Sequence, residues 1–88
     1  MSRFVDEFFS RDLRISLGED TVTRKKYLSF PVANPYVDYE EHYALTAGEY
    51  AEFKKDWTAA VAFADAARRR EKDDRLILQP GQFRGSPT

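Results

Sequence analysis

Cysteine is absent from the sequence, histidine, methionine and tryptophan each occur once, and no apolar run is long. Without cysteine there is no disulfide, which fits a reducing compartment, so we expect a cytoplasmic protein. No stretch approaches the roughly 20 apolar residues that span a bilayer. Acidic residues also interrupt the N-terminus, where a signal peptide would be apolar. We therefore expect a soluble protein that does not act at a membrane.

The length of 88 residues suits one domain, which can bury about 60–65% of its unfolded surface without covalent links. We predict a single α+β domain over residues 1–80 and a flexible tail over 81–88, which is rich in Gly, Ser and Pro. The net charge of −1 gives no global field that would favour nucleic acid or an anionic membrane.

Aromatic residues, by contrast, are frequent: they make up 15% of the chain, with seven Phe and five Tyr. A small domain needs some of these rings in its core. Tyr is also favoured at interfaces, because its large rigid ring carries a polar tip. We expect some rings to face a partner.

The first thirty residues predict a helix and a hairpin. The spacing of four apolar residues indicates one helical face, and so a short N-terminal helix over about 3–11: Phe4, Val5, Phe8 and Phe9. Residues 13–17 alternate as in a strand, and Gly18-Glu19-Asp20 is a turn signal before a second strand over 22–30.

Pro31 and Pro35 indicate a connection, and the run from Tyr36 to Leu45 is the clearest strand. Its alternation places one set of side chains on a largely apolar face: Val37, Tyr39, Glu41, Tyr43 and Leu45. The other face carries the intervening residues: Tyr36, Asp38, Glu40, His42 and Ala44.

Thr46 and Glu49 form a capping-box pattern, which predicts that a helix begins at residue 47. An apolar stripe at spacings of three and four extends this helix to about residue 72: Tyr50, Phe53, Trp57, Val61 and Ala64. Residues 75–79 predict a last strand. The expected fold is therefore α+β: a mainly antiparallel sheet of about four strands packed on one long helix in the C-terminal half, with a short N-terminal helix.

Glu41 lies between two tyrosines on the apolar face of the strand. A buried carboxylate needs a cation or several hydrogen-bond donors. We expect a structural pairing of Glu41 with Arg14, Arg24 or Lys26, or else a bulge in the strand.

His42 is the only histidine, and only Asp38 and Glu40 lie near it on the same strand face. A metal site or a catalytic triad would need further groups from elsewhere. Paired carboxylates act in catalysis only across a cleft that separates their pKa values. We therefore predict no enzyme activity, no metal and no cofactor, and we interpret His42 as a surface or partner contact.

A basic cluster, Arg68-Arg69-Arg70, joined by Arg84, could contact nucleic acid. Acidic residues follow the cluster at once, and no aromatic residue is interleaved for base stacking. Nucleic-acid binding is thus the disfavoured alternative.

The segment from Tyr39 to Phe53 is an acidic, aromatic strand that runs through a capped turn into an amphipathic helix. It resembles small bacterial immunity proteins, the cognate inhibitors of polymorphic or contact-dependent toxins. The resemblance implies that the chain binds a toxin domain and occludes its active site or substrate surface. The expected contacts are on the acidic strand face: Tyr36, Asp38, Glu40 and His42. The alternatives are a small nucleic-acid-associated regulator or antitoxin that uses Arg68 to Arg70 and Arg84, and an accessory subunit of an enzyme assembly.

Overall fold

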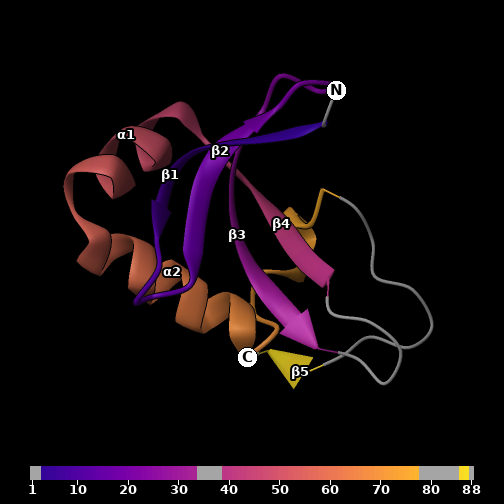
Figure 1. Ribbon diagram of the computed structural model, residues 1–88, viewed down its shortest axis with the longest axis vertical. Helices are drawn as coiled ribbons and strands as arrows, with labels where there is room; N and C mark the ends of the chain where they lie inside the picture. Colours follow the sequence, from indigo (N-terminus) through magenta and orange to yellow (C-terminus); the bar gives the residue numbers. More distant parts are fainter. Residues whose placement is uncertain (1–2, 34–38, 78–85, 88) are drawn as a thin grey trace.

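The computed structural model describes residues 3–33, 39–77 and 86–87. Four strands form an antiparallel sheet in the order β1-β2-β3-β4, and a short β5 pairs with β3 (Figure 1). Both α-helices follow the sheet in sequence and lie on the same side of it (Figure 1). The elements are β1 (Phe4–Ser10), β2 (Ile15–Asp20), β3 (Lys26–Ala33), β4 (Tyr39–Leu45), α1 (Ala47–Lys55), α2 (Trp57–Arg68), the 3-10 helix η1 (Asp73–Arg75) and β5 (Ser86–Pro87). The α+β class is confirmed.

The hydrophobic core lies between the helices and one face of the sheet. Alternate residues of β2, β3 and β4 supply the sheet side, and the small face of α2 allows the helix to approach closely: Ala60, Ala64 and Ala67 are buried. Phe30 and Tyr43 stack in this layer, and Phe63 from α2 meets Tyr43 edge to face. Trp57, expected in the middle of the stripe, is partly buried and packs against this cluster.

The predicted N-terminal helix is wrong, because these residues form strand β1. The register of β1 against β2 shifts between Asp6 and Phe8, so Glu7 is the extra residue of a β-bulge. The bulge brings Val5 and Phe8, three residues apart, to the same face of the sheet, opposite Glu19 and Leu17. A spacing of three on one face imitates helical periodicity, and this explains the error.

The single long helix over 47–72 is also wrong, because the chain breaks at Asp56. Asp56 has an extended backbone, ends α1 and caps α2, and its side chain accepts a hydrogen bond from the Thr58 amide. This break turns α2 relative to α1, so that both helices cover the sheet (Figure 1). The capping box of Thr46 and Glu49 is confirmed.

Gly18 is not in a turn. It lies inside β2 opposite Tyr27, where an added Cβ would come 2.6 Å from the tyrosine hydroxyl oxygen and 2.1 Å from the carbonyl oxygen of Val5. Glycine is required here for close approach rather than for a turn. The turn between β2 and β3 lies at residues 21–25 instead, and Arg24 adopts a left-handed backbone there (φ 64°).

The predicted strand over 75–79 is reduced, in its described part, to an isolated bridge between Leu76 and Tyr43 beside β4, after η1. Residues 78–79 lie outside the described residues. Within the predicted tail, Ser86 and Pro87 form β5, and the other tail residues are not described. β3 continues through Pro31, which was expected in a connection, and Pro31 lies opposite Glu40 of β4.

Candidate functional site: the open face and edge of the sheet

The face of the sheet opposite α1 and α2, called here the open face, brings together residues from β1 to β4. The two α-helices cover the other face (Figure 1). The side chains of the open face come from alternate positions of each strand: Phe4, Asp6, Phe9, Ser16, Tyr27, Ser29, Pro31, Glu40 and His42. They fall into a packed aromatic cluster and a hollow.

His42 lies in the aromatic cluster. Its ring stacks on Phe4 with centroids 3.7 Å apart and meets the edge of Tyr27 at 4.8 Å. Burial by these rings lowers the pKa of His42 to about 4. The Tyr27 hydroxyl donates a hydrogen bond to Asp6, and burial together with this bond raises the pKa of Tyr27 far above its ordinary value. His42 is therefore neutral at pH 7, and its ring packs between the Phe4 and Tyr27 rings of the open face.

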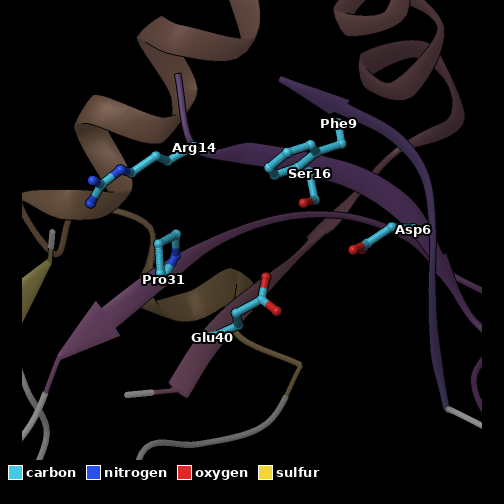
Figure 2. Close-up of a pocket in the computed structure, with 6 residues that line it drawn as sticks. All are labelled: Asp6, Phe9, Arg14, Ser16, Pro31 and Glu40. Carbon is cyan, nitrogen blue, oxygen red and sulfur yellow. The ribbon is translucent and has the colours of Figure 1, made fainter. Parts of the chain in front are cut away.

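Beside this cluster is a hollow of about 260 Å³. Its lining comes from four strands, β1 to β4, and from the turn before β2: Asp6, Phe9, Arg14, Ser16, Pro31 and Glu40. Figure 2 shows the carboxylates of Asp6 and Glu40 pointing toward one another across the hollow, while the Arg14 guanidinium points away from both. Ser29 donates a hydrogen bond to Glu40 (3.2 Å). The hollow can accept hydrogen bonds and cations beside an apolar ring.

Exposed apolar side chains gather on β1. Of the five large hydrophobic residues that are exposed in the described part of the chain, four lie on β1 or in the turn after it: Val5, Phe8, Phe9 and Leu13. Phe9, which also lines the hollow, is 62% exposed. The fifth, Val22, lies in the β2–β3 turn, at the opposite end of β1 from Phe9.

Polar contacts from the helix side anchor β1. Glu7, at the bulge, accepts hydrogen bonds from the Tyr50 hydroxyl of α1 and from Lys26 (3.2 Å), and the Tyr50 bond is the main cause that lowers the pKa of Glu7. Lys54 of α1 places its Nζ 5.6 Å from the centroid of the Phe8 ring. The edge strand is thus held in place while its apolar side chains remain exposed.

Asp20 fixes the other end of β1 and the β2–β3 turn. Its buried carboxylate accepts two hydrogen bonds from Arg3, at 2.8 and 2.9 Å, and one each from the Val22 amide and the Thr23 hydroxyl. These donors, with Arg3 the largest cause, hold the pKa of Asp20 far below its ordinary value. A short polar side chain that bonds the backbone two residues on is typical of turns.

Of the four predicted partner contacts, Glu40 is exposed beside the hollow and His42 is partly buried under Phe4. Tyr36 and Asp38 lie outside the described residues, as does Arg84. The sequence interpretation missed Asp6 and Phe9 as parts of this surface. Phe4 and Asp6 are two residues apart and therefore share one face of a strand, and Phe9 joins that face after the bulge. This pattern can be recognised only when residues 4–10 are interpreted as a strand with a bulge.

The arginine cluster is already engaged in local contacts. The Arg68 guanidinium lies over the Phe30 ring, with Cζ 4.9 Å from its centroid, and donates to Asp65. Arg69 pairs with Glu71 at 2.8 Å, and Arg70 has a left-handed backbone (φ 62°) beyond the end of α2.

Glu41 is buried, as expected. A cation was expected to pair with it, and the structure shows hydrogen bonds from two tyrosine hydroxyl groups. Glu41 accepts hydrogen bonds from Tyr39 (2.9 Å) and Tyr43 (2.7 Å), its neighbours on the same strand face. Two of the three cations expected to pair with it bind Glu19 instead: Arg24 at 3.4 Å and Lys26 at 3.2 Å. The tyrosines that flank Glu41 in the sequence were themselves the signal for this arrangement.

Within the described residues, no group of three or more His, Cys, Asp or Glu side chains is placed to hold a metal ion. Over the same residues, no helix combines the length and apolar character needed to cross a bilayer. No protein-family model, curated protein or solved structure matches this chain.

Proposed function

We propose that this protein acts by binding another protein through β1 and the adjoining open face, and that it is an immunity protein. In this proposal it neutralises a cognate bacterial toxin domain by occluding the toxin's active site or substrate surface. The observation that carries the proposal is the gathering of exposed apolar side chains on one edge strand beside two carboxylates. Exposed apolar groups that cluster in this way mark interaction sites rather than ordinary surface.

The chemistry of the surface supports a basic partner. Phe9 supplies an exposed ring, and Asp6 and Glu40 supply negative charge on the same face. Aromatic anchors contribute binding energy, and complementary charge raises the rate of encounter. Toxins that act on nucleic acid often have basic clefts, and an acidic, aromatic surface is complementary to such a cleft.

The size of the hollow supports a partner side chain as its occupant. Its volume of about 260 Å³ is below the range of about 300–1,000 Å³ that is typical of small-molecule sites. One arginine or lysine side chain, with its cation between the two carboxylates and its stem along Phe9, suits this space better than a free substrate does. We therefore propose a binding role without catalysis.

The nucleic-acid alternative gains no support from the position of its residues. Arg68 lies over a core ring and Arg69 is paired with a carboxylate, so these two cations are already compensated. A surface that binds the nucleic-acid backbone needs cations that can replace condensed counterions.

The proposal predicts that a large secreted protein with a variable C-terminal domain is encoded directly upstream of this chain, and a pull-down with that domain tests it. We expect a stoichiometric complex, and protection of cells in which the two proteins are produced together. Phe9→Ser and Glu40→Lys should each weaken the complex by about tenfold or more, which corresponds to about 1.4 kcal/mol.

Val22→Ser is the matched control, because Val22 is 67% exposed but lies in the β2–β3 turn, away from the hollow. It should bind like the unmodified protein. Absence of a complex would contradict the proposed function. Equal binding by all three variants would remove this surface from the proposal.

A further inference from the structure

The outer edge of β1 lies at the edge of the sheet and is bordered by apolar and acidic side chains. β1 is the first strand in the sheet order, and within the described residues it pairs with β2 alone. Alternate residues of an edge strand direct unpaired backbone N–H and C=O groups outward, and this row of groups is complementary to another extended backbone. The edge spans seven residues, comparable with an average strand.

Side chains on both faces border this edge. On the helix face, an added strand would contact Val5 and Phe8, which are 46% and 44% exposed. On the open face it would contact Asp6 and Phe9. Glu7 is already bound by Tyr50 and Lys26, so Asp6 is the exposed carboxylate at the middle of the edge that faces the hollow.

Charge excludes a second copy of this chain as the favoured occupant. In an antiparallel pair of β1 strands aligned at their middles, Glu7 of one copy lies opposite Glu7 of the other, and Asp6 lies opposite Phe8. Like charges directly opposite one another destabilise a strand pair. The acidic side chains in the middle of β1 therefore disfavour pairing of this edge with its own copies.

We propose that the outer edge of β1 binds an extended segment of the partner as an added strand, and that this segment carries a basic side chain over Asp6 between apolar residues. The inference rests on the proposed function and names the segment that the partner supplies. Backbone hydrogen bonds hold the strand, the apolar side chains cover Val5, Phe8 and Phe9, and the basic group lies over Asp6 at the rim of the hollow.

Three synthetic peptides, each as long as β1 and blocked at both ends, test the inference. The first alternates Thr and Val around a central Arg, the second has Glu in place of the Arg, and the third is the Arg peptide with alternate backbone amides methylated. Binding is measured by amide chemical shifts and by hydrogen exchange of the protein. We expect the Arg peptide to protect amides of β1, the Glu peptide to bind about fivefold or more weakly, and the methylated peptide not to bind.

Asp6→Asn separates charge from strand pairing, because Asn keeps an acceptor for Tyr27 but removes the charge. In this variant the Arg and Glu peptides should bind within about twofold of one another. Binding of no peptide, equal binding of all three, or shifts that map away from β1 would overturn the inference. Protection of β1 amides that rises with protein concentration, without any peptide, would assign the edge to a second copy and would also overturn it.

The two proposals fail separately. If the toxin domain is captured in a manner that depends on Phe9 but no peptide binds β1, strand addition is wrong and the proposed function stands. If the Arg peptide binds β1 but the toxin domain is not captured, the edge binds a strand and the immunity function is wrong.

Discussion

His42 illustrates how one residue can take a role different from the one its position suggests. Acidic neighbours on an exposed strand face would ordinarily favour the charged imidazole. In the folded protein, Phe4 covers the ring, and burial outweighs the attraction of Asp6 and Asp20, so the pKa of His42 falls to about 4. His42, predicted as a surface or partner contact, is partly buried beneath Phe4 and beside Tyr27.

A pH dependence of stability follows from this pKa. The unfolded chain binds a proton at His42 below about pH 6.5, whereas the folded protein does so only below about pH 4. The unfolded state therefore holds more protons between these values, and the free energy of unfolding should fall by about 2 kcal/mol as pH falls through this window. Urea unfolding from pH 7.5 to 4.5 measures it.

His42→Gln is the control, because glutamine does not titrate. The variant should lose most of the slope between pH 6.5 and 4.5, whatever its stability at pH 7.5. The charged groups that act on His42 are Arg3, Asp6 and Asp20. Asp20, with its lowered pKa, adds its own loss of stability only below about pH 4. An unchanged slope in the variant would show that His42 is not buried in solution.

At the scale of elements, Asp56 decides where one helix ends and the next begins. Asp56→Ala should remove the cap of α2 and lower the free energy of unfolding by about 1 kcal/mol. Asp56→Asn should cost only a few tenths, because asparagine caps equally well. The side chain is exposed, so lost packing does not enter the comparison. Chemical denaturation measures both, and equal losses would contradict the capping role.

The sequence predicted the elements whose local signals agree with their tertiary setting. β4 keeps strict alternation, and its described apolar positions, Tyr39, Tyr43 and Leu45, all face the core. The start of α1 was predictable because a capping box depends only on residues three apart. Asp56 carried a similar signal, which the apolar stripe running across it concealed.

The features that could not be predicted depend on contacts between distant residues. The bulge at Glu7 places its carboxylate where Tyr50 and Lys26, far along the chain, donate hydrogen bonds to it. Gly18 lies in a strand, and glycine is needed there because the Tyr27 side chain and the Val5 carbonyl leave no room for a Cβ. The candidate site combines residues of all four main strands, so its hollow became visible only once the register of the sheet was known.

At the scale of the whole molecule, the aromatic residues divide between two tasks. Phe63 is 7% exposed and packs against Phe53 and Tyr43, whereas Phe9 is 62% exposed. Phe63→Ala should therefore lower the free energy of unfolding by about 3–4 kcal/mol. Phe9→Ala should change it by less than about 0.5 kcal/mol, although the same ring is removed. Urea unfolding of the two variants at pH 7.5 makes the comparison.

The effects of the two variants on binding should rank in the opposite order to their effects on stability. Under the proposed function, Phe9→Ala should weaken capture of a toxin domain about tenfold or more. Phe63→Ala, under conditions where it remains folded, should bind with nearly unchanged affinity, because Phe63 lies in the core on the other face of the sheet. A Phe9→Ala protein as unstable as Phe63→Ala would mean that the Phe9 ring is buried in solution. In that case the described part of the open face would offer no exposed aromatic ring to a partner, and the exposed apolar side chains of β1 would be Val5 and Phe8, on its other face.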